Sequence, residues 1–445
     1  MQNLATELNQ ISQYERYGRV TTVQGLLVEA DGIEKIVSVG SRLTIETRGL
    51  LGAVMGEVIG FRDSRTLLMP FGSLEGVGIG CRVILNDVDP VVYPSDHWLG
   101  RVIDSMALPI DGGGPLIDGP AAMRLRSDPP PAHTRQRVSG KIDLGVRSLN
   151  TFVTACSGQR LGIFAGSGIG KSILLSMLAR FTATDIAVIG LIGERGREVK
   201  EFIQENLGPA GLARSVVVVA TGDESALRRR QAAYLTITTA EYFRKQGHNV
   251  LCLMDSVTRF AMAQREIGLS MGEPPASKGY TPTVFAELPR LLERAGPGPN
   301  GEGNITGLFT VLVEGDDHNE PISDAVRGIL DGHIVLDRSI ADRGRYPAIN
   351  ILRSVSRVMP ACNNDQENAL VQRARTLMAT YEDMAELIRI GAYRKGTDPL
   401  VDEAVQYHAA LEGFLSQGPN DHATLSDGYA HLAAILGVTE TKSGE

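Results

Sequence analysis

The sequence has little of what marks secreted, membrane-spanning or nucleic-acid-binding proteins. Its 445 residues include 4 cysteines and 1 tryptophan, and only 5% are aromatic. No apolar run approaches the roughly 18 residues of a membrane-spanning helix, and we expect no secretory signal because the first residues lack an apolar segment. The cysteines form no CxxC pair and no metal-ligand cluster, so we expect buried free thiols in a reducing cytosol. They are Cys81, Cys156, Cys252 and Cys362.

An excess of basic residues is also missing. The formal net charge is −8 and the isoelectric point is about 5.6, which argues against nonspecific binding to a polyanion. Residues 1–90 carry more Asp and Glu than Lys and Arg, so they do not form a basic arm. With Trp98 as the single tryptophan, a stacking platform for single strands is hard to build. We therefore expect no nucleic-acid partner.

The chain divides by pattern into three segments. Residues 1–15 have apolar side chains at helical spacing, and the rest of residues 1–90 forms short β-rich pieces that predict a small barrel or sandwich. Residues 91–357 alternate between strands and helices, and residues 358–445 are mostly helical and polar. We take these three ranges as the expected domains.

The middle segment carries short, continuous apolar runs. Such runs predict strands that are buried on both faces, as in a parallel sheet flanked by helices. The fold class is therefore α/β, with a mainly parallel sheet in the central domain. The expected strands are residues 160–165, 185–192, 215–220, 249–255 and 307–314.

Residues 165–172, AGSGIGKS, follow an apolar run and predict a phosphate-binding loop. Ala165 replaces the first glycine of the usual pattern, which is tolerable if its φ stays negative. Backbone N–H groups of the loop and the following helix dipole point at phosphate oxygens. Lys171 is expected to reach the β- and γ-phosphates, and the Ser172 hydroxyl to bind Mg²⁺. The expected loop residues are Gly166, Ser167, Gly168, Ile169, Gly170, Lys171 and Ser172.

Carboxylates follow two other predicted strands. Residues 250–254 are apolar and end in Asp255, the Walker B pattern, which holds Mg²⁺ through water. Glu194 follows another strand and would lie at the same sheet edge, where it can orient the attacking water. Glu198 lies four residues later; support of the Mg²⁺ shell and pairing with an arginine are equally good interpretations.

Two further residues stay open when judged by themselves. Tyr346 precedes a proline in a loop, where it either stacks on adenine or belongs to the core. Arg357 is far from the loop in sequence, and judged by itself it is better interpreted as a surface residue than as an arginine finger for a neighbouring site.

Taken together and in order, the motifs resemble the hexameric ATPases related to the catalytic subunit of the rotary ATP synthase. Within them, the chain is most similar to the type III export ATPases, and specifically to the flagellum-specific branch, whose loops typically begin with Ala as at Ala165. The resemblance implies a RecA-like ATPase domain between an N-terminal barrel and a C-terminal helical domain. The strings that carry it include GERGRE (193–198), LMDSVTRFAMAQREI (253–267), YPAINILRSVSRVM (346–359) and IRIGAYRKGTDPLVDEA (388–404).

The resemblance also implies a role for each matching residue. It leaves the second aromatic wall of the adenine pocket without a match. It assigns Lys171 and Ser172 to phosphate and Mg²⁺, Glu194 to catalysis, Arg195 to the phosphate site, Asp255 to the Walker B position, Arg259 to the same site, Tyr346 to adenine and Arg357 to the finger.

The implied function is ATP hydrolysis that energises flagellar protein export, with Mg²⁺ as cofactor. Because Glu194 and Arg357 lie on one chain, we expect a homo-oligomeric ring, by resemblance a hexamer. The implied partners are a regulatory stator-like protein at the N-terminus, a stalk protein, the export gate and chaperone–substrate complexes. The implied location is cytoplasmic, with peripheral association with the inner membrane at the flagellar base.

Three alternatives remain at this point. The first is the ATPase of a virulence injectisome, which has the same chemistry. The second is an RNA-translocating hexamer, against which the acidic residues 1–90 count. The third is a non-catalytic nucleotide-binding subunit, which would lack a carboxylate at the position of Glu194.

Overall fold

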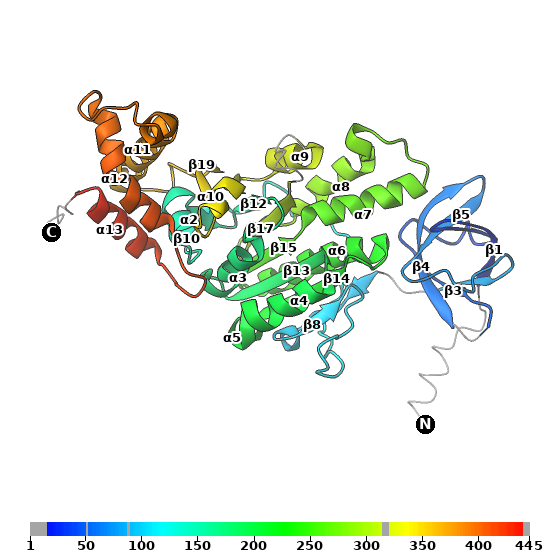
Figure 1. Ribbon diagram of the computed structural model, residues 1–445. Helices are drawn as coiled ribbons and strands as arrows, with labels where there is room; N and C mark the ends of the chain where they lie inside the picture. The colour runs from blue at the N-terminus through cyan, green and yellow to red at the C-terminus, as the bar shows by residue number, and fades with distance from the viewer. Residues whose placement is uncertain (1–15, 50–51, 87–89, 314–319, 439–445) are drawn as a thin grey trace.

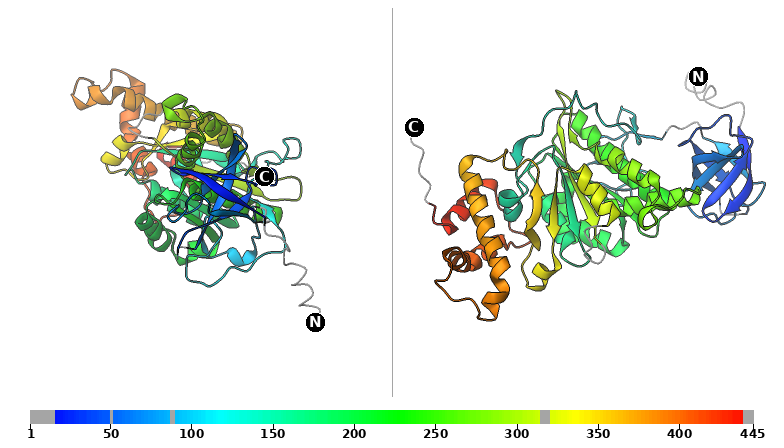
Figure 2. Two further views of the ribbon diagram at one scale, coloured as in Figure 1. Left: turned by 90° about the vertical axis from the view of Figure 1, so that its right-hand side faces the viewer. Right: turned by 90° about the horizontal axis from the view of Figure 1, so that it is seen from above.

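The computed structural model describes residues 16–49, 52–86, 90–313 and 320–438. A β-barrel lies at one end, an α/β domain in the middle and a group of helices at the other end (Figures 1 and 2). This is the predicted fold class, with its three parts in the predicted order. The helix expected over residues 1–15 lies outside the described residues.

The N-terminal part is a closed barrel in the strand order β1-β2-β5-β4-β3-β6. Alternating side chains face its interior, as in β3, where Leu43 and Ile45 are buried between half-buried neighbours. Closing the barrel leaves no free sheet edge. The strands are β1 (Tyr17–Gln24), β2 (Leu27–Asp31), β3 (Arg42–Glu46), β4 (Ala53–Arg62), β5 (Arg65–Pro70) and β6 (Arg82–Leu85).

The barrel is anchored to the central domain through apolar contacts and buried charge. Ile59 and Phe71 of the barrel join one apolar cluster with Leu227 and Ile267 of two central helices. Beside it, the buried Glu57 carboxylate accepts from Arg230 at 2.8 Å, and Arg126 lies at the same distance from the same oxygen. The charge of Glu57 thus compensates a buried guanidinium across the domain junction.

Replacement of Glu57 by Gln is expected to loosen this junction. It leaves the Arg230 charge buried without its carboxylate, and breaking one partner of such a pair costs about 3–5 kcal/mol. We expect a clear fall in the thermal and urea midpoints of unfolding, followed by circular dichroism. The matched control is Glu29→Gln, whose partner Arg65 is half exposed; it should cost less than about 1 kcal/mol. Equal midpoints for the two variants would contradict the anchoring role of Glu57.

The central sheet is nine-stranded, in the order β19-β18-β12-β17-β15-β13-β14-β8 with β16 paired to β17. Its pairings are parallel except those of β19 and β16, as the apolar runs predicted. The short β8, which the sequence did not indicate, pairs with β14 and extends the sheet. The strands are β8 (Val102–Asp104), β12 (Arg160–Ala165), β13 (Ile186–Glu194), β14 (Ser215–Thr221), β15 (Val250–Asp255), β16 (Gly296–Pro297), β17 (Asn304–Leu312), β18 (Gly332–Leu336) and β19 (Ile349–Ser356).

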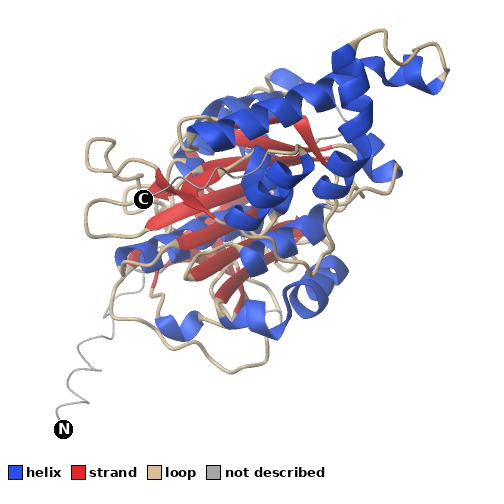
Figure 3. Ribbon diagram, turned by 90° about the vertical axis from the view of Figure 1, so that its left-hand side faces the viewer, coloured by secondary structure: helices blue, strands red, loops and turns tan. Residues whose placement is uncertain are grey.

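Helices cover both faces of this sheet (Figure 3). One face packs on α2, α3 and the C-terminal helices, and the other on α6 to α9. The helices are α2 (Arg147–Phe152), α3 (Lys171–Phe181), α4 (Gly196–Glu201), α5 (Gly208–Ala213), α6 (Ala226–Lys245), α7 (Val257–Ser270), α8 (Pro282–Leu292), α9 (Pro321–Ile329) and α10 (Arg338–Asp342). Small pairs of strands border the domain: β7 (Val91–Val92) with β9 (Met123–Arg124), and β10 (Ser139–Ile142) with β11 (Ala155–Ser157).

The C-terminal part consists of α11 (Asp365–Arg389), α12 (Pro399–Leu415) and α13 (Leu425–Ile435). A capping box between Asn364 and Glu367 satisfies the free backbone N–H groups at the start of α11. Leu377, Phe414 and Leu432 continue the apolar core of the central domain. Among the described residues, no helix is long and apolar enough to span a membrane.

The prediction about the cysteines is half right. All four are free, and Cys156 and Cys252 are buried. Cys81 and Cys362 are only partly buried, so the expectation of four buried thiols was wrong for these two. Cys362 lies in an irregular turn before α11 rather than in a packed strand.

Candidate functional site

The phosphate-binding loop joins β12 to α3, as expected from its sequence. Gly168 and Gly170 have φ angles of +76° and +85°, which side chains with a Cβ rarely adopt. Ala165 is buried as the last residue of β12, and Ile169 of the loop is also buried. The loop therefore turns on two of its glycines and presents its backbone at the start of α3.

Lys171 follows the loop after β12 and contacts side chains at the ends of two other strands, β13 and β15. Its ammonium group lies 2.5 Å from Asp255 at the end of β15 and 3.3 Å from Glu194 at the end of β13. Parallel strands bring these ends to one sheet edge. Although burial disfavours the charged form, the two carboxylates raise the pKa of Lys171 above its ordinary value. The ammonium group is therefore held charged at the point where strand ends meet.

The carboxylate of Glu194 is in an unusual environment. Burial, and then the negative charge of Asp255, raise its pKa above the ordinary value, and Lys171 only partly opposes this. Asp255 itself is buried and accepts a hydrogen bond from the Thr310 hydroxyl at 2.7 Å. The Lys171 ammonium group is thus faced by Glu194, whose pKa is raised, and by Asp255, which is buried and hydrogen-bonded. Perturbed pKa values of this kind are common at catalytic sites.

Arg195 precedes α4 as its N-cap residue, and Glu198 lies in the first turn of that helix. The Glu198 carboxyl contacts that of Glu194 and contributes to its raised pKa. It also pairs with Arg195 at 3.2 Å, although the Arg195 side chain is 85% exposed. Both interpretations of Glu198 from the sequence therefore have a physical basis.

Arg259 and Ser172 occupy different surroundings around this cluster. A Cβ on Gly193 would meet the Arg259 side chain at 2.9 Å, so Arg259 packs over the backbone next to Glu194. Its Nε is buried without a hydrogen-bond partner among the described residues. Ser172 is exposed on the first turn of α3, open to a ligand that enters the loop.

Tyr346 lies against the loop. A Cβ on Gly170 would come within 3.3 Å of its ring, which is 44% exposed. Its carbonyl accepts from the Gln417 N–H at 2.9 Å. The segment after α12 therefore reaches Tyr346, and Asn420 and Pro419 of this segment contact Arg180 of α3. This segment is a C-terminal contribution that the sequence could not assign.

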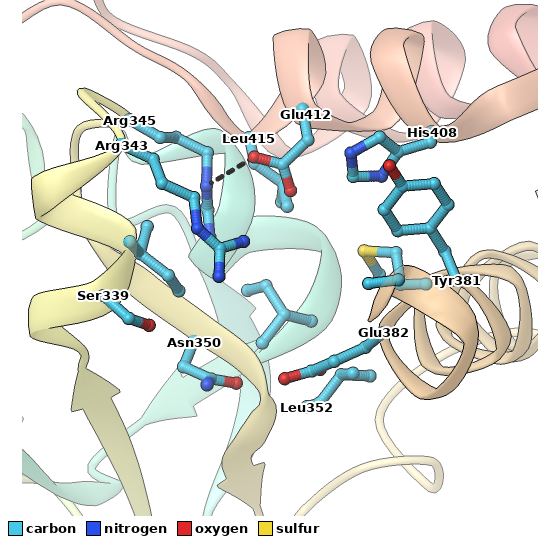
Figure 4. A pocket seen from close by; sticks show the side chains of 14 residues that line it. Ser339, Arg343, Arg345, Asn350, Leu352, Tyr381, Glu382, His408, Glu412 and Leu415 are labelled. Carbon is cyan, nitrogen blue, oxygen red and sulfur yellow. Dashed lines mark ion pairs between the residues drawn. The ribbon is translucent and has the colours of Figure 1, made fainter. Parts of the chain in front are cut away.

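An open cavity of about 210 Å³ lies where α10 and β19 face α11 and α12 (Figure 4). Arg345, the residue before Tyr346, points into it and pairs with Glu412 at 3.0 Å. On the opposite wall, the rings of Tyr381 and His408 stack at 3.4 Å. The junction between the central and C-terminal parts is thus incompletely packed beside Arg345, the neighbour of Tyr346.

Arg357 does not join the cluster of its own chain. Its N–H and that of Arg160, the first residue of β12, both donate to Asp331, whereas the phosphate-binding loop follows the last residue of β12. β12 has six residues, so its two ends lie about 17 Å apart at 3.3 Å per residue. The exposed Arg357 side chain donates to the Arg327 carbonyl at 3.0 Å. It is available to a neighbouring molecule and not to Lys171 of the same chain.

Two residues that contact the site were not identified from the sequence. Arg338 donates to the Ser167 carbonyl in the loop at 2.8 Å, and Thr310 holds Asp255. Thr310 is the polar residue within the apolar part of β17, which was the available signal. No pattern pointed to Arg338.

Family profiles agree with the three parts of the structure. The ATP synthase alpha/beta family matches with its beta-barrel domain over residues 20–85 and with its nucleotide-binding domain over residues 145–356. The T3SS EscN ATPase C-terminal domain matches residues 363–434. The flagellum-specific ATP synthase of Caulobacter vibrioides is 57% identical over 98% of this chain and 99% of its own length.

The chain belongs to the flagellum-specific ATP synthase family. The Bacillus subtilis member is 47% identical, with 99% of each chain covered. The structure of the assembled ATPase EscN, from the type III secretion system of enteropathogenic E. coli, aligns with a TM-score of 0.87 at 38% identity, over 94% of this chain and all of that one. With the family's nucleotide-binding domain and its phosphate-binding loop in place, the protein is an ATPase of the type III export class.

Proposed function

We propose that this ATPase hydrolyses Mg-ATP at sites shared between the subunits of a homo-oligomeric ring, and that hydrolysis drives flagellar protein export. The observation that carries the proposal is the cluster of Lys171, Glu194 and Asp255 at one end of the parallel strands, with Arg357 beside the opposite end of β12. One chain thus holds both halves of a site that a single copy cannot assemble.

In this site, each residue has a defined task. The loop from Gly166 to Gly170 binds phosphate oxygens through its backbone, and Lys171 leaves its carboxylates to neutralise the β- and γ-phosphates. Glu194 then orients the attacking water and accepts its proton, which its raised pKa favours. Arg357 of a neighbouring copy stabilises charge on the transferring phosphoryl group.

The donor set fits Mg²⁺ as the cofactor. Ser172 lies on the first turn of α3, Asp255 contacts Lys171 at the start of that helix, and Glu198 contacts Glu194 beside them. Hard cations prefer such oxygen donors. Mg²⁺ usually keeps several waters and is bound by few protein ligands together with the phosphates of its substrate. When bound, Mg²⁺ would neutralise phosphate charge.

The remaining nucleotide contacts would come from three directions. Tyr346 would stack on adenine, and the segment 417–420 is our candidate for the opposite wall, because Gln417 bonds to the Tyr346 carbonyl. Arg195 and Arg259 flank Glu194 and would approach the phosphates.

The partners are proposed by analogy with relatives. EscN has been solved in complex with its central stalk EscO, so we propose a stalk protein at the centre of the ring. A stator-like regulator at the N-terminus, the export gate and chaperone–substrate complexes complete the proposed set, at the cytoplasmic side of the inner membrane. The higher identity to flagellum-specific members than to EscN favours the flagellar over the injectisome branch.

The ring is tested by measuring specific ATPase activity against protein concentration. Because a site needs two copies, activity per chain at saturating Mg-ATP should rise at least severalfold as the chains assemble. Light scattering on the same samples gives the mean mass, and the two curves should share a midpoint. Constant specific activity across the range in which the mass changes would refute the shared site.

A further inference from the structure

Two cysteines that are remote in sequence meet at the junction of the central and C-terminal parts. Cys156 lies in the middle of β11, and Cys362 lies in the turn between β19 and α11. Both are free thiols, and they lie close enough for each to shift the pKa of the other. Neither thiol has a task in the proposed ATPase site.

The chain on both sides of the pair is already held together. The Thr154 N–H donates to the Met359 sulfur at 3.2 Å, and the Ser356 hydroxyl donates to the Thr154 carbonyl at 2.7 Å. Lys141, the cross-strand neighbour of Cys156, forms an ion pair with Glu367 in the first turn of α11. The two segments are therefore held side by side by contacts on both sides of the cysteines, and a disulfide needs such proximity.

The two thiols differ in reactivity. Cys362 is partly exposed, and the neighbouring Cys156 thiol, together with the charge of Lys141, lowers its pKa to about 7. Cys156 is buried, and its pKa is raised, first by the neighbouring Cys362 side chain. Since the thiolate is the nucleophile, Cys362 is the attacking thiol and Cys156 the resolving one.

We propose that Cys156 and Cys362 form a reversible disulfide when a hydroperoxide reaches the junction. The Cys362 thiolate attacks one peroxide oxygen, the O–O bond breaks and a sulfenic acid forms with release of water. The Cys156 sulfur then displaces the hydroxyl group, the S–S bond forms and a second water leaves. Two thiols lose two electrons and two protons, and one hydrogen peroxide becomes two waters.

The disulfide would fasten β11 to the turn that begins the C-terminal part. It closes a loop that contains most of the central domain, and cross-links over long loops restrict the chain most. In a reducing cytosol such bonds are transient and sensing rather than structural. The other two cysteines are natural controls, because Cys252 is fully buried with a pKa raised to about 12 and Cys81 lies in the barrel.

The full-length protein is treated with hydrogen peroxide, digested without reductant and examined by mass spectrometry. We expect a peptide pair linked through Cys156 and Cys362, loss of two thiols per chain, and full recovery with dithiothreitol. Cys252→Ser should behave as the wild type, and Cys362→Ser should abolish the link. Cys156→Ser should leave a sulfenic acid at Cys362 that dimedone traps.

Two further measurements use the wild-type protein, so their results do not depend on whether a variant folds. Phenylarsine oxide, which bridges neighbouring thiols, should bind once per chain and protect both cysteines from alkylation. Hydrogen exchange of residues 357–364 should slow about tenfold after oxidation and recover on reduction, since opening of this turn is then restricted. Absence of the linked peptide, oxidation of Cys362 with Cys156 still free, or unchanged exchange after linkage would each overturn the proposal.

Discussion

Replacement of Glu194 by Gln is expected to lower the turnover number for ATP by about 10²–10⁴-fold, the usual contribution of a positioned general base. The amide keeps the shape of the side chain but cannot accept the proton of the attacking water. Binding of Mg-ATP should survive, because Lys171 and the loop backbone are untouched and one source of negative charge near Asp255 is removed. Stopped-flow binding of a fluorescent ATP analogue and a phosphate-release assay measure the two effects separately.

The comparison variant is Glu198→Gln, four residues later in the first turn of α4. Glu198 is paired with the exposed Arg195 and is proposed only to support Mg²⁺, so its loss should lower turnover less than that of Glu194, the proposed base. In cells, the Glu194→Gln protein should fail to restore motility to a strain that lacks the gene. An unchanged hydrolysis rate in Glu194→Gln would favour a non-catalytic nucleotide-binding subunit.

The second large effect is expected at Arg357. Replacement by Ala should lower turnover by about 10³-fold or more, as for other arginine fingers. Because Arg357 lies at the sheet edge opposite Lys171, its defect should be complemented by a different copy. When Arg357→Ala and Glu194→Gln chains are mixed in equal amounts, about one quarter of randomly assembled interfaces combine an intact Glu194 with an intact Arg357. Mixing should therefore restore activity that neither variant has alone.

The control for this experiment is Arg353→Ala in β19, the strand that ends one residue before Arg357. Arg353 is also exposed, and its side chain pairs with Asp337 at the long distance of 3.7 Å, so its replacement should change turnover less than about twofold, as is usual for a surface position. No recovery in the mixed sample, with mixed rings verified by tagged pull-down, would contradict the assignment of Arg357 to the neighbouring site.

The parts of the site that were predictable are those whose chemistry needs particular residues next to a strand end. AGSGIGKS indicated both the turn and the ligand, since positive φ at Gly168 and Gly170 is what a tight loop around phosphate requires. Asp255 and Glu194 followed apolar runs, and parallel strands bring such residues to one edge. The contact of both with Lys171 is therefore a consequence of local pattern plus one rule of sheet topology.

Other contacts depend on segments that no local pattern connects. Thr310 reaches Asp255 because β17 lies between β12 and β15, and Gln417 reaches Tyr346 because the C-terminal helices fold back on the central domain. β8 has only three residues, too few for a periodic signal, and it is ordered by pairing with β14. Such pairings are decided by the packing of the whole chain.

The sequence by itself determined the chemistry of this protein: the phosphate-binding loop, the carboxylates at strand ends, the α/β class and the family. Each depends on residue type and short-range spacing, which survive without knowledge of the fold. Only the tertiary structure decided which side chains remote in sequence lie next to one another. It placed Arg357 away from its own Lys171, Cys156 beside Cys362, and Glu57 against Arg230 across two domains. These contacts join residues far apart in the chain, so they exist only once the core has brought their strands and helices together.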